Sequence, residues 1–312
     1  MSVRLLHLSD PHFGTERGEV VAAVREAAAR LAPDMIVLSG DITQRARDAQ
    51  FAAAAGFMAS LGDVASLAVP GNHDIPLFNL PLRLLDPYRG FRAHFGALPL
   101  PAASSRVGDV ELLSLVSCPP SRHKNGELDL AGLAAALPGG GAPLRAVVLH
   151  HPLDCRLAQD EHNLLRGADE AVRMFCAWGV DLVLGGHIHD PYVSTSAARY
   201  PAAGAPAVLA LAGTCVSHRT RRGIPNSFNL ICLEAGPSAT MLVERHDYDE
   251  GARQFRLAAS LRFMRAEQGG WSEFAALCRA AAPTFNLPRH HPGAPDKQGR
   301  PCLKRRTSRS FR

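Results

Sequence analysis

Five short polar clusters, each directly following an apolar strand-like segment, constrain this 312-residue chain more than any other feature. The first half alternates strand-like runs with segments of helical spacing: strands at 3–9, 35–39 and 65–69, helices at 19–32 and 48–61. This alternation predicts a parallel sheet with crossover helices. Further strands are expected at 110–117, 145–149 and 180–184, with helices at 129–137 and 169–178.

Other regions lack this alternation. Residues 76–95 combine prolines with leucines and aromatics, which predicts an irregular insertion with one short helix that could cap a site or form an interface. From 191 to 248 we expect short strands separated by Gly, Pro and Asn, and then a helix at 272–281. The simplest division is one α/β domain over residues 1–285, followed by a basic, disordered tail over 286–312.

The positive charge of the chain is concentrated at its C-terminal end. The formal net charge is +5. Residues 289–312 contain eight Lys and Arg side chains and one Asp, so this segment carries +7 and the remainder −2. The near-neutral body argues against a continuous basic groove for nucleic acid. The tail is expected to make only weak, salt-sensitive contacts with anions.

Composition excludes several classes of protein. Seven scattered cysteines include no Cys-x-x-Cys pair, which predicts free thiols in a reducing environment rather than a disulfide framework or a structural zinc cluster. The apolar runs are far shorter than the roughly 18–20 residues that a membrane span requires, and no secretory signal is evident. We therefore expect a globular cytoplasmic protein without integral membrane segments, whose oligomeric state is open.

The polar clusters contain the residue types of a metal site. In chain order they are Asp10-Pro11-His12, Gly40-Asp41, Gly71-Asn72-His73-Asp74, His150-His151 and Gly186-His187-Ile188-His189. Because the carboxyl ends of strands in an open α/β sheet share one edge, all five are expected to meet in one crevice. Asp, Asn and neutral His are oxygen and nitrogen donors for ions such as Mn, Fe or Zn. Seven donors exceed the need of one ion with an open position, so we expect two ions.

These motifs, in this order, resemble those of the calcineurin-like metallophosphoesterase superfamily, and most closely those of bacterial class III cyclic-nucleotide phosphodiesterases. The closer resemblance is carried by His-Leu-Ser-Asp-Pro-His-Phe, Leu-Ser-Gly-Asp-Ile-Thr and Pro-Gly-Asn-His-Asp. It implies a four-layer αββα sandwich with a dinuclear metal site at the C-terminal strand ends. By the same resemblance seven residues bind the two ions: Asp10, His12 and His189 the first, Asn72, His150 and His187 the second, and Asp41 both.

The resemblance also implies a mechanism and a substrate. A metal-bound hydroxide would attack the phosphodiester, while His73 contacts the phosphate and protonates the leaving oxygen. Asp74 would orient His73. His151 is a weaker candidate ligand than His150, because the family's ligand is the first histidine of the pair. The best candidate substrate is a 3′,5′-cyclic nucleotide.

Further substrate contacts and other activities stay open. A basic and polar loop after the strand-like run 207–211 carries candidate phosphate- or base-binding side chains: Arg219, Arg221, Arg222 and Asn226. The same metal site would serve a phosphodiesterase, pyrophosphohydrolase or phosphatase acting on another small phosphoester. A nuclease that uses the basic tail is a weaker alternative. A metal-free scaffold is the weakest, because every expected ligand is present.

Overall fold

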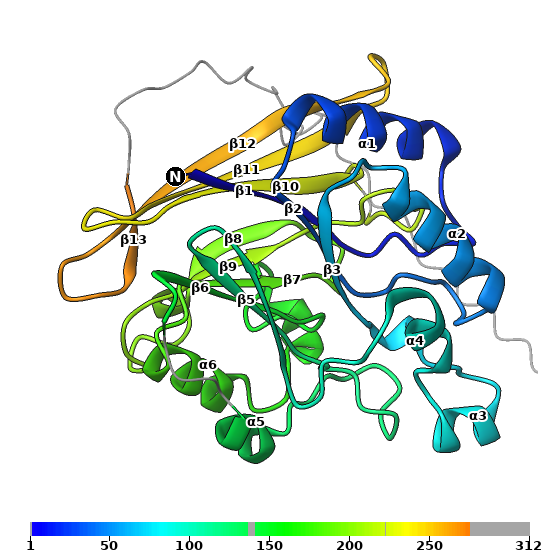
Figure 1. Ribbon diagram of the computed structural model, residues 1–312, viewed down its shortest axis with the longest axis horizontal. Helices are drawn as coiled ribbons and strands as arrows, with labels where there is room; N and C mark the ends of the chain where they lie inside the picture. The colour runs from blue at the N-terminus through cyan, green and yellow to red at the C-terminus, as the bar shows by residue number, and fades with distance from the viewer. Residues whose placement is uncertain (1, 137–140, 222, 275–312) are drawn as a thin grey trace, which may run out of the picture. The chain divides into compact units, whose positions relative to one another are not determined.

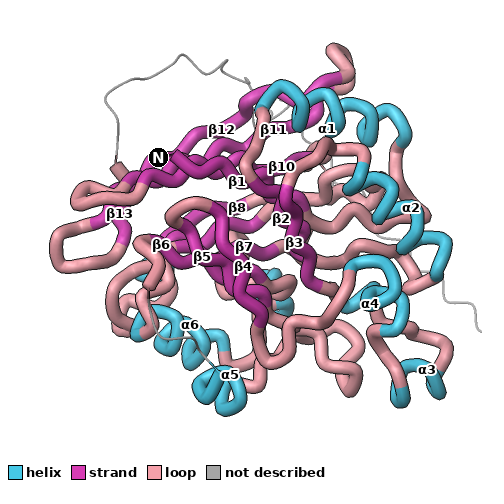
Figure 2. The backbone as a smooth tube through the Cα atoms, viewed as in Figure 1, coloured by secondary structure: helices cyan, strands magenta, loops and turns pink. Residues whose placement is uncertain are grey.

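Two stacked sheets, with helices against the outer face of each, form the architecture in the computed structural model (Figure 1, Figure 2). The structure describes residues 2–136, 141–221 and 223–274. The two sheets and their helical layers confirm the predicted αββα sandwich. The expected boundary between domain and tail lies outside the described residues, as do Cys278 and Cys302. The five described cysteines form no disulfide.

The first sheet has seven strands in the order β13-β12-β11-β10-β1-β2-β3. Its parallel part consists of β1 (Ser2–Leu8), β2 (Met35–Ser39) and β3 (Ala65–Val69), connected by α1 (Gly18–Leu31) and α2 (Asp48–Ala59). This β-α-β-α-β unit confirms the sequence prediction. The antiparallel part contains β10 (Ser227–Glu234), β11 (Thr240–Asp249), β12 (Gln254–Arg265) and β13 (Trp271–Glu273).

The second sheet has six strands in the order β4-β5-β6-β7-β9-β8. Their bounds are Ala103–Val107 (β4), Val110–Ser114 (β5), Leu144–Val148 (β6), Leu182–Gly185 (β7), Tyr192–Thr195 (β8) and Val208–Leu211 (β9). The helices α5 (Leu130–Ala136) and α6 (Ala168–Ala177) belong to this half. The insertion after β3 contains two short helices instead of the one expected: α3 (Leu80–Leu85) and α4 (Arg89–Phe95).

The antiparallel strands differ most from the sequence predictions. β10 and β11 have eight and ten residues, longer than the short strands expected there. The helix expected at 272–281 is wrong at its start, because Ser272 and Glu273 pair with β12 as part of β13. The indole of Trp271 fixes this strand by donating a hydrogen bond to Asp181 Oδ1 at 2.8 Å. The remainder of the expected helix lies outside the described residues.

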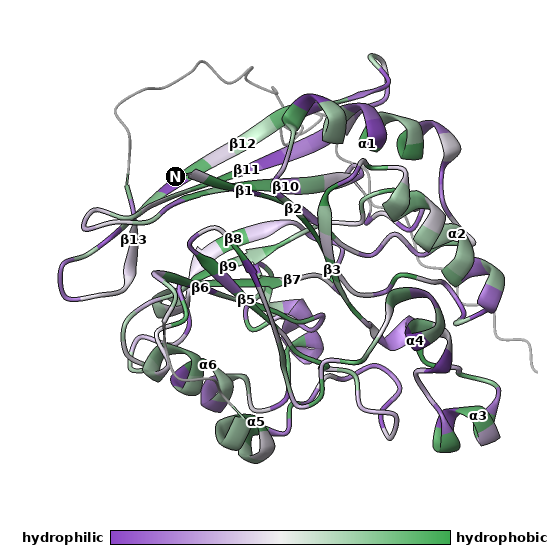
Figure 3. Ribbon diagram, viewed as in Figure 1, coloured by the Kyte–Doolittle hydropathy of each residue, from purple (hydrophilic) through white to green (hydrophobic). Residues whose placement is uncertain are grey.

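Successive side chains of a strand point to opposite faces of its sheet, and apolar side chains pack on both faces of each sheet. On β1, Leu5 lies in the core between the sheets, whereas Leu6 and Leu8 pack with Val24 of α1 and Phe51 of α2. Hydrophobic colour is strong on β1, β7 and β10, whereas β11 is largely hydrophilic in colour (Figure 3). Among the described residues, no helix is both long and apolar enough to cross a membrane.

Candidate metal centre

All seven predicted metal ligands lie just beyond the carboxyl ends of parallel strands. Asp10 and His12 follow β1, Asp41 follows β2, Asn72 follows β3, His150 follows β6, and His187 and His189 follow β7. Both sheets therefore contribute ligands to one site. The ligand atoms of every residue except Asn72 fall into two groups, and within each group all atoms lie within 4.8 Å of one another.

The first group joins Asp10, His12, Asp41 and His189. His189 Nε2 lies 3.1 Å from Asp10 Oδ1 and 3.0 Å from His12 Nε2. His12 Nε2 lies 3.6 Å from Asp41 Oδ2. Two carboxylates and two imidazoles, with their oxygen and nitrogen atoms directed at one point, form a donor set suited to Mn, Fe or Zn.

The second group joins Asp41, His150 and His187. His150 Nε2 lies 3.4 Å from Asp41 Oδ1 and 3.2 Å from His187 Nδ1. Asp41 therefore presents Oδ2 to the first group and Oδ1 to the second, as a bridging ligand requires. Asn72 lines the same pocket as Asp41 and His187.

Three buried atoms of this cluster have no hydrogen-bond partner among the described residues. They are Oδ1 of Asp10, Oδ1 of Asn72 and Nε2 of His187. A buried polar atom without a partner costs about 1–3 kcal/mol, so such atoms in a native site call for a ligand. Together with the shared carboxylate of Asp41, they fit a pair of metal ions better than a solvent-filled cluster.

Backbone carbonyls orient two of the ligand imidazoles. His150 Nδ1 lies 2.9 Å from the carbonyl oxygen of Ser39, and His189 Nδ1 lies 2.6 Å from that of Arg219. A proton on Nδ1 that is donated to a carbonyl leaves the lone pair of Nε2 free for a metal ion. Both imidazoles are thus oriented with Nε2 toward the site.

Burial controls the charge of the histidines. Removal from water lowers the pKa of His12 to about 3 and holds the pKa of His187 well below its usual range, although Asp41 opposes both shifts. His150 differs: burial lowers its pKa, but the Asp41 carboxylate outweighs burial and raises it to about 9. Neutral imidazole is the form that binds a metal ion, so metal binding at His150 releases a proton.

The ligands adopt a backbone conformation that is uncommon for residues other than glycine. Five of them have positive φ angles: Asp10 (50°), His12 (45°), Asp41 (47°), His187 (73°) and His189 (57°). Such residues concentrate at functional sites, where the surrounding structure compensates for the strain. Here the left-handed turns come immediately after the strands, so the chain bends back and directs successive side chains to one centre.

Gly186 allows the two halves of the site to approach each other. Ser9 Oγ donates a hydrogen bond to Asp10 Oδ2 at 2.6 Å, and the His187 amide donates to the same oxygen at 3.0 Å. A Cβ atom at position 186 would lie 1.9 Å from Ser9 Oγ and 2.3 Å from Asp10 Oδ2. Any side chain there would displace a metal ligand.

Gly186→Ala is therefore expected to lower metal affinity by about tenfold or more, because moving an outer-shell partner of a ligand typically costs that much. Competition with a chelator of known affinity measures this change. Gly56→Ala is the matched control, since a Cβ at that position in α2 meets nothing within 4 Å. Equal metal affinity in the two variants would show that the close approach at Gly186 is not needed for the site.

A comparison with protein families identifies the family of the chain. The sequence profile described as calcineurin-like phosphoesterase matches residues 3–191, which include all seven predicted ligands. This chain belongs to the calcineurin-like phosphoesterase family. A search of curated proteins found no significant match.

Solved structures of two phosphatases share this fold. Purple acid phosphatase PPD1 from yellow lupin (Lupinus luteus) seeds has a TM-score of 0.59 and 14% identity, covering 84% of this chain and 53% of its own. The chain thus spans about half the length of the lupin enzyme. A dimetal phosphatase from Danio rerio has a TM-score of 0.53 and 14% identity, covering 82% of this chain and 98% of its own.

In this member of the family, His73 lies beside the predicted metal ligands. Its amide donates to Asp41 Oδ1 at 2.8 Å, and its ring meets the ring of His12 edge-on with centroids 4.9 Å apart. Nδ1 lies 3.0 Å from the carbonyl oxygen of Gln44. A proton on Nδ1 donated to this carbonyl leaves Nε2 directed at the site.

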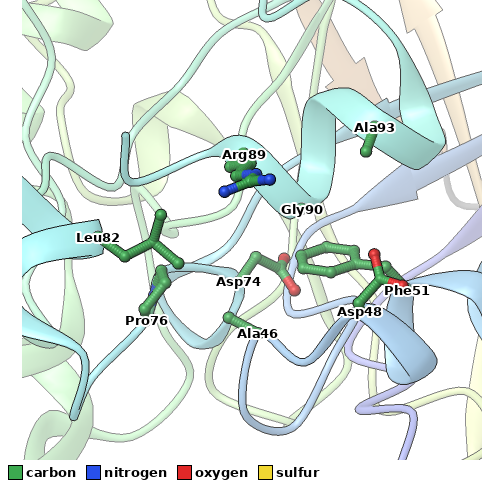
Figure 4. Close-up of a pocket in the computed structure, with 9 residues that line it drawn as sticks. All are labelled: Ala46, Asp48, Phe51, Asp74, Pro76, Leu82, Arg89, Gly90 and Ala93. Atoms are coloured by element: carbon green, nitrogen blue, oxygen red, sulfur yellow. The ribbon is translucent and has the colours of Figure 1, made fainter. Parts of the chain in front are cut away.

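Asp74 acts on the backbone around the site. Its carboxylate accepts hydrogen bonds from the amides of Ile42, Thr43 and Gly71 and from the hydroxyl of Thr43, at 2.7–3.0 Å. None of the hydrogen bonds found among the described residues joins it to the His73 ring. Any orientation of His73 by Asp74 would therefore pass through the loops. Asp74 also lines a pocket of about 360 Å³ beside Phe51 (Figure 4).

The structure separates the four residues predicted to contact substrate. Arg219 lines the metal pocket, and its Nη1 donates to Gln44 Oε1 at 3.0 Å. Arg221 instead pairs with Asp160 at 2.7 Å. Asn226 is buried and donates to the carbonyls of Thr214 and Ser217. Arg222 lies outside the described residues.

Several residues of the pocket were not singled out by the sequence analysis. The pocket has a volume of about 360 Å³, and its lining includes His123, Lys124, Asp160 and Asn163. His123 and Lys124 lie in the connection after β5, and Asp160 and Asn163 lie in the 3₁₀ helix Ala158–Asn163. None of them comes directly after a strand, so spacing could not identify them. The one available signal was composition: Lys124 is the first lysine of the chain and the next is Lys297.

Proposed function

We propose that this phosphoesterase hydrolyses a small phosphodiester with two metal ions, and that a 3′,5′-cyclic nucleotide is the first substrate to test. The observation that carries the proposal is the Asp41 carboxylate, which faces one donor group with each oxygen. Two ions on these ligands would lower the pKa of a water molecule and neutralise phosphoryl oxygens, which is the chemistry that hydrolysis requires. Mn, Fe and Zn all suit the donors.

His73 is proposed as the general acid. As an imidazolium, with its Nδ1–H held at the carbonyl oxygen of Gln44, His73 would donate its Nε2 proton to the leaving oxygen and become neutral. Asp74 is a positioning residue in this proposal, because its hydrogen bonds hold the loop after β2 against the turn that carries His73.

Arg219 is proposed to bind the phosphoryl group. Its Nη1 lies 3.3 Å from His73 Nε2 and 3.1 Å from His12 Nδ1, so the guanidinium occupies the space between the general acid and a metal ligand. It has no carboxylate partner among the described residues. A guanidinium in that position can donate to a phosphate oxygen as negative charge develops.

Three expectations from the sequence stay predictions. They are a cytoplasmic location, weak contacts of residues 286–312 with anions, and the possibility that copies of the chain associate. Pyrophosphate, monoester and nucleic-acid substrates are outcomes of the test below.

The proposal is tested by hydrolysis of bis-p-nitrophenyl phosphate against p-nitrophenyl phosphate. Protein stripped with a chelator should lose turnover, and added Mn²⁺ should restore it with preference for the diester. Asn72→Ala should reduce the restored rate by about tenfold or more, because one ligand of the second ion is lost. Adenosine and guanosine 3′,5′-cyclic monophosphates are then assayed with the same preparation.

Preference for the monoester would change the proposal to a phosphatase. Faster turnover of single-stranded DNA than of any small diester would favour a nuclease. Turnover that survives complete metal removal would contradict the proposal altogether.

A further inference from the structure

Lys124 has an unusual place in both sequence and structure. The chain contains 31 arginines and three lysines, and Lys124 is the only lysine before residue 297. It lines the same pocket as the metal ligands Asp41, His187 and His189. A chain that places arginine almost everywhere else thus has a compact ammonium group at its proposed active site.

The positive charge of Lys124 is not balanced by a carboxylate. Asp160, which lines the same pocket, is paired with Arg221 at 2.7 Å, and Asp190 pairs with Arg156 at 2.7 Å. Among the described residues, no carboxylate oxygen lies within 4 Å of the Lys124 ammonium. Arg219 is proposed to contact the scissile phosphate. The ammonium of Lys124 is therefore available to bind a second negative group of the substrate.

The side chains of Asn163 and His123, which line the same pocket as Lys124, are polar and form no hydrogen bond with any described residue. Asn163, with 8% of its surface exposed, lines the pocket, and its side-chain amide has no hydrogen bond to any described residue. His123 lines the pocket with an equally unbonded ring. None of the described residues that line this pocket is Phe, Tyr or Trp, and Ile188 is its only aliphatic side chain. The only rings among these lining residues are imidazoles, so the pocket has no large apolar ring face for a nucleobase.

The loop of Lys124 is anchored to the metal site through its backbone. His151 Nε2 lies 2.9 Å from the Lys124 carbonyl oxygen, and His151 Nδ1 lies 2.9 Å from Ser117 Oγ. Ser117 Oγ also accepts a hydrogen bond from the amide of the metal ligand His150 at 3.2 Å. A Cβ at Gly126 would lie 2.2 Å from the His151 ring, so the loop packs tightly there.

We propose that Lys124 and Asn163 form a subsite for a second oxyanion, a carboxylate or a phosphate, on one arm of the phosphodiester. The inference rests on the proposed function and narrows its substrate class. The ammonium of Lys124 attracts the anion, and the amide of Asn163 donates to it. The rigid attachment of the loop to His151 reduces the entropy lost on binding.

This subsite predicts an order of kcat/KM among substrates. A 3′,5′-cyclic nucleotide has one negative charge, which the metal ions and Arg219 would occupy, and its base would meet a polar wall. An open diester with a further carboxylate or phosphate would use both parts of the pocket. The proposal therefore places such diesters above cyclic nucleotides in kcat/KM.

The test compares diesters that differ by one anionic group. Glycerophosphoserine and glycerophosphoethanolamine differ by a carboxylate; glycerophosphoinositol 4-phosphate and glycerophosphoinositol differ by a phosphate. With Mn²⁺-loaded full-length protein, the more anionic member of at least one pair should have a kcat/KM about tenfold higher. The pair that shows the preference identifies the anion as carboxylate or phosphate.

Variants of Lys124 then test whether its side chain causes the preference for the more anionic diester. Lys124→Met should bring the ratio within the preferred pair close to one, and Lys124→Arg should retain most of it. The backbone anchor to His151 is independent of this side chain, so both variants should fold and bind metal. Arg106→Met, on the distant strand β4, is the control that should leave the ratio unchanged.

The two proposals fail in different ways. Turnover of bis-p-nitrophenyl phosphate without any preference within the pairs, or a preference that survives in Lys124→Met, overturns the subsite and leaves the proposed function standing. If no diester is turned over, calorimetric binding of phosphoserine against phosphoethanolamine to the metal-loaded protein tests the subsite alone. Equal affinities for these two probes, together with equal affinities for inositol 1,4-bisphosphate and inositol 1-phosphate, would then overturn it.

Discussion

Asp41→Asn is expected to abolish nearly all phosphodiesterase activity, with kcat/KM reduced at least about 10³-fold. The reason is that Asp41 is the one residue whose two oxygens face both donor groups, at 3.6 Å from His12 and 3.4 Å from His150. Asparagine has the same shape but carries no negative charge, and only one of its terminal atoms can donate a lone pair. The variant should therefore hold fewer metal ions, which elemental analysis of the dialysed protein measures.

The control for this prediction is Asp63→Asn. Asp63 is exposed and forms no ion pair with any described residue. Its replacement removes the same charge from the chain without touching the site, so activity and metal content should equal those of the wild type. An Asp41→Asn protein with wild-type turnover would show that no bridged pair of ions is needed.

His73→Asn is expected to lower kcat by about 10²–10⁴-fold on diesters with an alkyl leaving group, because such groups leave only when protonated. The loss should be much smaller on bis-p-nitrophenyl phosphate, whose leaving phenolate is stable without a proton. Metal content should stay at the wild-type level, since His73 lies beside the ligands and is not one of them. Steady-state kinetics on the two substrate types, with elemental analysis, measures the three quantities.

His94→Asn provides the matched control for His73. His94 lies on α4, with Nε2 2.8 Å from Asp48 Oδ1 at the surface. No change in kcat is expected there. An equal loss on both substrate types in His73→Asn would argue that His73 binds the phosphate without transferring a proton.

The sequence was sufficient to predict the ligand cluster, because the signals were local. Each predicted ligand lies two to four residues after the last residue of a strand with a strong apolar pattern. Because such strand ends converge at one edge of a sheet, residues as distant in sequence as Asp10 and His189 are expected to meet. In the structure, Asp10 Oδ1 lies 3.1 Å from His189 Nε2. A second sheet was implied by the family resemblance, and the periodicity of the sequence did not predict it.

The antiparallel strands were harder to predict for a physical reason. β12 is rich in Arg, Leu and Ala, which favour helices, and its exposed residues show no regular alternation. It is a strand because β11 pairs with it along almost its whole length. Such pairing depends on distant chain segments, so a local pattern cannot reveal it. The same limit explains the wrong helix prediction at Ser272 and Glu273.

The loop that carries Arg219 and Arg221 contains two residues whose different roles could not be predicted from their positions in the sequence. Arg219 and Arg221 are two residues apart and have the same side chain. Arg219 faces the pocket because its carbonyl accepts from His189, whereas Arg221 is drawn to the buried carboxylate of Asp160. Only the three-dimensional positions of those partners separate the two arginines.

The most direct test of the central claim is a titration of the metal-free protein with Mn²⁺ that follows bound metal and diester turnover together. Two ions should bind per chain, and full turnover of bis-p-nitrophenyl phosphate should be reached only when the second has bound. Full turnover with one ion per chain, or without any metal, would show that a two-metal site is not needed.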